Sequence, residues 1–131
     1  MRTDPVCPES LLKSLPETVR EWVAQWKHVT RITVSGSQVT SAHLAKFGKL
    51  ILLEELCLTG CNVTDDDLAN LSGLTNLKYL YIAGTSVTDA GLVHLRGMKK
   101  LTHFYPANSR VTGSGISKFR RYHPDCHIGG F

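Results

Sequence analysis

Residues 53–76 read LEELCLTGCNVTDDDLANLSGLTN, and residues 77–100 continue with LKYLYIAGTSVTDAGLVHLRGMKK. The two stretches align without a gap, and the flanking stretches 29–52 and 101–124 fit the same register. All four therefore share a period of 24 residues, and a half unit, DCHIGGF, follows the last of them. Repetition at a fixed period of about 20 to 50 residues is typical of solenoids, propellers and repeat arrays.

Seven positions in each unit are apolar almost throughout. In the unit 77–100 they are Leu77, Leu80, Ile82, Val87, Leu92, Leu95 and Met98. One unit cannot bury such a set alone, whereas stacked units join into a continuous core. The 131 residues suffice for one domain with a core and are too few for two. The sequence therefore predicts a single α/β solenoid domain over 1–131.

Each unit predicts a strand, then a turn, then a helix. Leu56 and Leu58 alternate with period two, as in a strand, whereas Leu68, Leu71 and Leu74 recur at a spacing of three, as on a helix face. Residues that tolerate a positive φ mark the turns: Gly36, Gly60, Gly84 and Asn108. A threonine stands at each expected helix N-cap: Thr40, Thr64, Thr88 and Thr112. Gly73 and Gly97 stand where C-cap glycines are expected.

Both ends of the array are predicted to carry caps. Residues 8–28 are predicted to form a helical cap, because Ser14 and Glu17 make a capping-box pattern before an apolar stripe. The stripe consists of Leu15, Val19, Trp22, Val23 and Trp26. It is interpreted as the cover of the first repeat, the alternative being a helix that docks a partner.

Residues 125–131 are predicted to be a C-terminal cap with a fifth strand around Ile128. The unit before this cap carries Pro106 where Leu58 and Ile82 stand earlier. Proline cannot donate to a strand ladder, so a local distortion of the strand surface is expected there.

The unit pattern LxxLxLxGTxVTDxGLxxLxxMxxL resembles leucine-rich repeats of the ribonuclease-inhibitor-like, cysteine-containing type. VTDAGL at 87–92 is similar to the bacterial form, and HPDCHI at 123–128 resembles a closing half-repeat. The resemblance covers 29–128. It implies a right-handed curved solenoid with parallel strands on the concave face, helices outside, and protein binding as the usual role.

Two side chains of each predicted strand face the concave surface. They are Arg31 and Thr33, Glu55 and Cys57, Tyr79 and Tyr81, and His103 and Tyr105. Neighbouring strands lie about 4.8 Å apart, so the last four side chains are expected to form one patch of four rings. Tyrosine is enriched in binding hot spots, and core packing requires no aromatic residue at these positions. We interpret the patch, together with Arg31 and Glu55, as a partner-binding surface, the alternative being rings that only cover an exposed sheet.

Charge is divided along the chain. Residues 1–76 carry −2 and residues 77–131 carry +6, within a total of +4. The basic residues Lys99, Lys100, Arg110, Lys118, Arg120 and Arg121 form the second candidate site. This basic cluster is interpreted as a solvated outer surface, the alternatives being a site for an acidic protein, a nucleic acid or an anionic surface. No nucleic-acid motif accompanies it, so nucleic acid is not expected. The charge division also suits head-to-tail self-association.

Other chemistry finds little support in the sequence. Four unevenly spread cysteines do not form a disulfide framework or a zinc pattern, which predicts reduced thiols in the cytoplasm and no metal. The acidic run 65–67 opens a helix, where it serves the dipole rather than catalysis. No cofactor motif is present, and no apolar run approaches the roughly 18–20 residues needed to span a bilayer.

The leading hypothesis is a non-catalytic protein–protein interaction module that binds a protein partner, one with an acidic or amphipathic patch, through the concave strand face. The alternative is a structural or assembly subunit that self-associates or completes a larger complex. An enzyme or a nucleic-acid binder is the third and weakest hypothesis.

Overall fold

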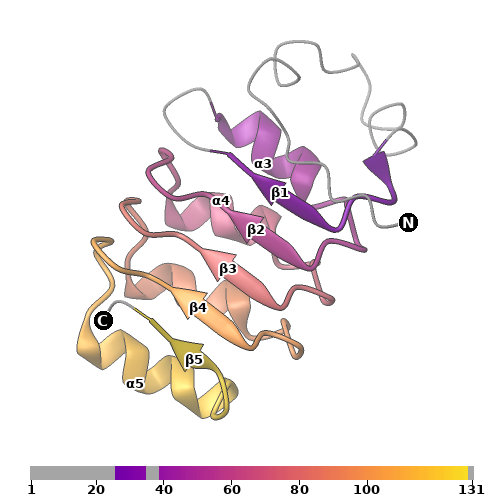
Figure 1. Ribbon diagram of the computed structural model, residues 1–131. Helices are drawn as coiled ribbons and strands as arrows, with labels where there is room; N and C mark the ends of the chain where they lie inside the picture. The colour runs from indigo at the N-terminus through magenta and orange to yellow at the C-terminus, as the bar shows by residue number, and fades with distance from the viewer. Residues whose placement is uncertain (1–25, 35–38, 130–131) are drawn as a thin grey trace.

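The computed structural model describes residues 26–34 and 39–129, in which five short strands lie side by side with the helical segments on one side of the sheet (Figure 1). The elements in chain order are β1 (Arg31–Thr33), α3 (Ser41–Phe47), β2 (Glu55–Cys57), α4 (Asp65–Asn70), β3 (Tyr79–Tyr81), the 3₁₀ helix η1 (Asp89–Leu95), β4 (His103–Tyr105), α5 (Gly113–Tyr122) and β5 (His127–Ile128). The strand order in the sheet equals the chain order, and every pair is parallel. The predicted α/β solenoid with parallel strands is therefore confirmed.

Each strand pairs with the next in a register that joins residues 24 positions apart. Between β2 and β3 the register pairs Glu55 with Tyr79 and Cys57 with Tyr81. The central residue of each of the first four strands is fully buried: Ile32, Leu56, Leu80 and Phe104. Its two neighbours are half-buried and project from the opposite face of the sheet.

The core runs along the whole described array. The apolar positions listed for the unit 77–100 are all buried, and so are their equivalents in the unit 53–76. The two turn glycines that fall within the described residues, Gly60 and Gly84, have φ of 74° and 70°, and Asn108 takes their place at 56°. These expectations from the repeat pattern hold, because side chains at such φ values are strained unless they are glycine or asparagine.

A side-chain lock joins consecutive units at the start of their helices. Asp65 accepts hydrogen bonds from the backbone N–H of Thr88 at 2.7 Å and from its hydroxyl at 2.5 Å. Asp89 accepts the same two bonds from Thr112. A Cβ on Gly91 would lie 2.4 Å from Oδ1 of Asp65, so only glycine leaves room for the lock. The Thr-Asp-x-Gly sequence of the repeat is thus explained by contacts between units.

Thr40, Thr64, Thr88 and Thr112 are the N-cap residues of the four helical segments, as predicted. The expected C-cap glycines are wrong, because the C-cap residues are Leu71 for α4 and Arg96 for η1, and neither Gly73 nor Gly97 has the positive φ of a capping glycine. The helix predicted in the unit 77–100 is the 3₁₀ helix η1.

Pro106 does not disturb the pairing of β3 with β4, which stays in register through Tyr81 and Tyr105. The N–H groups of Leu58 and Ile82 donate to the following strand, at Tyr81 and Tyr105. The equivalent acceptor for residue 106 would be residue 129, and β5 ends before it at Ile128. The proline therefore occupies the position in the ladder where a donor is not needed.

The predicted N-terminal cap over 8–28 lies almost entirely outside the described residues. Trp26, within them, is 7% exposed and belongs to the core. At the other end His123 is buried, and its Nε2–H donates to the Leu95 carbonyl at 2.8 Å.

The lock between units gives a first prediction. Asp65→Asn removes the charge that accepts two bonds from Thr88, so we expect the free energy of unfolding in urea to fall by about 1–3 kcal/mol. Asp66→Asn is the matched control, because Asp66 is exposed in the same helical turn and loses the same charge. Its effect should stay within about 0.5 kcal/mol. Equal effects of the two variants would contradict the lock.

Burial lowers the pKa of His123 below its ordinary value; the nearby Lys99 lowers it further, while the bond to Leu95 opposes the shift. The folded state therefore holds this ring neutral, whereas the unfolded chain takes up a proton below about pH 6.5. The free energy of unfolding should fall as the pH drops through that value. His123→Gln should flatten the profile between about pH 5 and 7; a slope identical to that of the wild type would exclude His123 as its cause.

Candidate binding surface

The face of the sheet opposite the helices, here called the strand face, presents two rows of side chains. The first row consists of Arg31, Glu55, Tyr79, His103 and His127, and the second of Thr33, Cys57, Tyr81 and Tyr105. Each residue lies beside its equivalent on the next strand because the register is constant. Every predicted site residue therefore belongs to one surface.

The four rings predicted to meet do so by stacking across the β3–β4 pair. The centroids of Tyr81 and Tyr105 are 4.6 Å apart with their planes 6° from parallel. Tyr79 and His103 are 4.8 Å apart at 24°, and His103 lies 6.2 Å from Tyr105. The two spacings between β3 and β4 match the distance between neighbouring strands, about 4.8 Å. The rings therefore stand side by side along the sheet.

A fifth ring, which was not among the predicted residues, extends the patch. His127 on β5 lies 5.5 Å from His103 and 6.1 Å from Tyr105, measured between ring centroids. The sequence could have predicted this ring, because His127 lies 24 residues after His103, one repeat length. Tyr79, Tyr81, His103, Tyr105 and His127 together are called the ring patch below.

Stacking decides which part of each ring a partner can touch. The flat faces of Tyr81 and Tyr105 cover one another, and the far face of Tyr105 lies against Gly129, where an added Cβ would be 2.3 Å from the ring. The rings are half-exposed on β3 and β4, the ring of His127 is exposed, and Nδ1 of His103 lies 2.9 Å from the hydroxyl of Thr102. Ring edges carry partial positive charge. The ring patch therefore offers donors and positive edges to acceptor groups, rather than flat platforms for stacking.

Burial raises the pKa of Tyr81, and the negative charge of Glu55 raises it further, with smaller contributions from Tyr105, Cys57 and Tyr79. Its phenol is therefore protonated at neutral pH and able to donate a hydrogen bond. Glu55 itself lies 4.0 Å from Nε of Arg31, with both side chains about one-third exposed. The first row thus runs from an ion pair on β1 and β2 into the rings.

The aspartates and cysteines that could suggest a catalytic or metal site have structural roles or are buried. Asp65 accepts from Thr88, and Asp67 accepts from the N–H of Thr64 at 3.0 Å. Cys61 and Cys126 are buried, and burial raises the pKa of the Cys126 thiol to about 11. No cluster of three metal-ligating side chains occurs within residues 26–34 and 39–129. In this same part of the chain, no helix has the length and apolarity to cross a membrane.

No protein-family model and no curated protein sequence matches this chain. A leucine-rich-repeat protein of Leptospira interrogans is similar in structure, with a TM-score of 0.62 and 16% identity over 87% of this chain and 28% of its own. Internalin C2 of Listeria monocytogenes has a TM-score of 0.61 and 22% identity over 82% of this chain and 43% of its own. Actin-binding site 2 of leiomodin-1 has a TM-score of 0.66 and 14% identity over 87% and 79%.

These likenesses show that the chain has a leucine-rich-repeat fold. The chain spans less than half the length of the Leptospira and Listeria proteins. At identities of this size the likeness extends to the fold and not to function.

The contact between Tyr105 and Gly129 gives a prediction for the ring patch. Gly129→Ala should push the Tyr105 ring away from β5 and weaken its stacking on Tyr81, because the new Cβ overlaps the ring. The near-ultraviolet circular dichroism of the tyrosines and their aromatic NMR shifts should change. Gly97→Ala is the control, since its Cβ would meet nothing closer than 3.9 Å. Unchanged ring signals in the Gly129 variant would contradict the described packing.

Proposed function

We propose that this protein is a non-catalytic interaction module that binds a protein partner through the strand face. The binding surface would comprise Arg31, Glu55 and the ring patch. The observation that carries the proposal is the ring patch itself, in which five rings from three neighbouring strands meet on the strand face. The equivalent positions on β1 and β2 hold no aromatic residue, so the fold does not require rings there.

The chemistry of the surface favours a partner rich in acceptor groups. Positive ring edges, phenol hydroxyls and imidazole N–H groups complement carboxylates and main-chain carbonyls. The net charge of +6 over residues 77–131 attracts such a partner over a longer range. Tyrosine-centred surfaces of this kind supply large contact area at a low cost in conformational entropy. We therefore infer a protein partner with an acidic patch.

The known relatives in structure are consistent with this role without defining it. Leiomodin-1 carries an actin-binding site in the domain that is similar to this chain. We further propose that the chain belongs to the ribonuclease-inhibitor-like, cysteine-containing type in its bacterial VTDAGL form. The proposed organisation is four 24-residue units over 29–124, with caps at 8–28 and 125–131 in a single cytoplasmic domain over 1–131. The constant spacing of the paired strand residues supports the four units.

The alternative function is a structural or assembly subunit that self-associates head to tail or completes a larger complex. The division of charge along the chain favours it. The acidic run 65–67 supports it less, because Asp65 and Asp67 are engaged within the chain and only Asp66 is exposed. Light scattering across a range of protein and salt concentrations separates the two functions. A strict monomer would exclude self-association.

The strand face is tested by affinity capture of a partner, followed by measurement of its Kd. A variant carrying both Tyr79→Ala and Tyr81→Ala removes the centre of the surface, and we expect Kd to rise at least about 30-fold, since hot-spot residues contribute about 2 kcal/mol or more. Tyr81→Phe keeps the ring and loses only the hydroxyl, so a rise of about 3- to 10-fold is expected.

Ile51→Ala is the control for this experiment, because Ile51 is 62% exposed and lies outside the strand face. It should leave Kd within about 2-fold, as contacts outside a hot spot are nearly neutral. Urea unfolding verifies that each variant is folded. A folded Tyr79 and Tyr81 double variant with the wild-type Kd would overturn the proposed function.

A further inference from the structure

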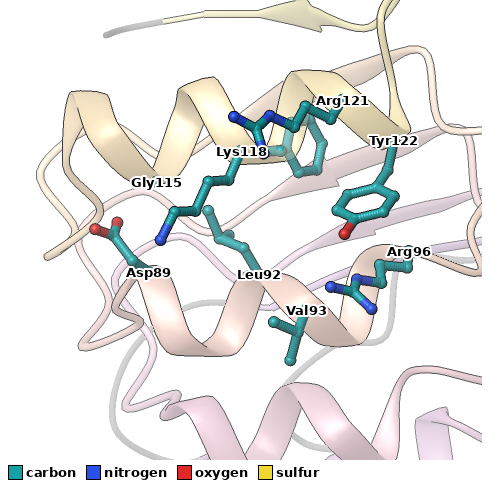
Figure 2. Close-up of a pocket in the computed structure, with 9 residues that line it drawn as sticks. Asp89, Leu92, Val93, Arg96, Gly115, Lys118, Arg121 and Tyr122 are labelled. Atoms are coloured by element: carbon teal, nitrogen blue, oxygen red, sulfur yellow. The ribbon is translucent and has the colours of Figure 1, made fainter.

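A groove lies between η1 and α5, in the helical layer on the other side of the sheet from the strand face (Figure 2). Its floor is apolar and consists of Leu92 and Phe119, with Val93 at its edge. Its other lining residues are Asp89, Arg96, Gly115, Lys118, Arg121 and Tyr122. The hollow measures about 130 Å³. Pockets for small molecules are typically about 300–1,000 Å³, so the groove has room for a single side chain and not for a cofactor.

One end of the groove is formed by a break in the repeat at the end of α5. Tyr122 stands at the repeat position of Leu50, Leu74 and Met98, which are buried, yet it is 42% exposed. The adjacent His123 points inward instead, with its ring 4.7 Å from that of Phe119. Tyr122 is thereby placed over η1, where the guanidinium of Arg96 lies 4.4 Å from its ring centroid. The pair closes one end of the groove.

Three cations line the groove, and Figure 2 shows Lys118 extending from α5 toward Asp89 at the start of η1. Among residues 26–34 and 39–129, no carboxylate lies within ion-pairing distance of Arg96, Lys118 or Arg121. The one acidic lining residue, Asp89, already accepts two hydrogen bonds from Thr112. The groove is therefore a basic site whose charges are unmatched within the described chain.

The solenoid does not require these cations. One repeat earlier, at the junction of α4 with η1, the positions of Arg96, Lys118 and Arg121 are held by Ser72, His94 and Gly97. The same packing of neighbouring helical segments is thus made without them. Arg96 contacts the Tyr122 ring, but packing of the fold gives no reason for Lys118 and Arg121 beside the exposed Val93, whereas a ligand that is both acidic and apolar does.

We propose that the groove between η1 and α5 binds an acidic peptide segment that inserts one apolar side chain. The inserted side chain covers Leu92, Val93 and Phe119, and flanking carboxylates pair with Arg96, Lys118 and Arg121. A phosphate or a nucleic acid would pair with the cations and leave Val93, at the edge of the groove, exposed to water. A purely apolar segment would cover the floor and leave the cations unpaired. The site is separate from the strand face, so this proposal can be tested independently of the proposed function.

The test is a titration of the ¹⁵N-labelled full chain followed by NMR. The probe is a peptide with a central leucine flanked on each side by two glutamates, capped at both ends. We expect saturable shifts of the amides of Val93, Arg96 and Gly115, with the ring patch unaffected. A peptide with glutamines in place of the glutamates, and one with alanine in place of the leucine, should each bind at least 5-fold more weakly.

Variants localise the site. Lys118→Gln and Arg121→Gln should each weaken binding of the acidic leucine peptide about 3- to 10-fold, and Tyr122→Ala should do the same by removing the end wall. Arg120→Gln is the matched control, because Arg120 is exposed on α5, removes the same charge, and does not line the groove. It should change Kd by less than 2-fold.

Three results would overturn the proposal. The first is equal weakening by Arg120→Gln and Lys118→Gln, which would reveal a diffuse basic surface. The second is equal affinity of the leucine and alanine peptides, or competition by inorganic phosphate or a DNA oligonucleotide at the peptide's own affinity, which would reveal an anion site. The third is the appearance of the shifts on the strand face, which would place acidic peptides at the ring patch and leave the groove without a ligand.

Discussion

The rest of the structure depends on the pairing of parallel strands in a constant register. Each of the first four strands buries one central residue, and each pairs with the next at a distance of 24 positions. A slip by one residue would turn the buried side chains onto the strand face and the exposed ones into the core. The alternation of buried and exposed residues therefore determines the register. In this register each strand residue lies beside the equivalent residue of the next unit.

Because of this constraint, equivalent positions of successive units lie side by side and form rows along the solenoid. In one row Asp65 and Asp89 bind the threonines of the following units, and the glycines Gly91 and Gly115 leave room for them. In another row the aromatic residues of β3, β4 and β5 stack at the strand spacing. The first row connects the units and the second creates a surface. Both arise from the same geometry, and only the residue type decides whether a row stabilises the fold or is available to a partner.

Two residues, Pro106 and Tyr122, depart from the repeat pattern. Pro106 coincides with the end of β5, so the missing donor falls where the sheet has no acceptor to offer it. At the end of α5, His123 takes the interior and Tyr122 is displaced outward over Arg96. The strand face follows from regular repetition, whereas one end of the groove between η1 and α5 is closed by residues at an interruption of the repeat.

The sequence alone determined the solenoid, the strand register, the turns and the helix N-caps, because each follows from periodicity or local backbone preference. It also determined that Tyr79, Tyr81, His103 and Tyr105 share a face, since a period of two and a period of 24 place them there. Only the tertiary structure decided how the rings meet and that His127 joins them. It likewise decided the helix ends and the position of Tyr122, because these depend on packing between units, which one unit's sequence does not contain.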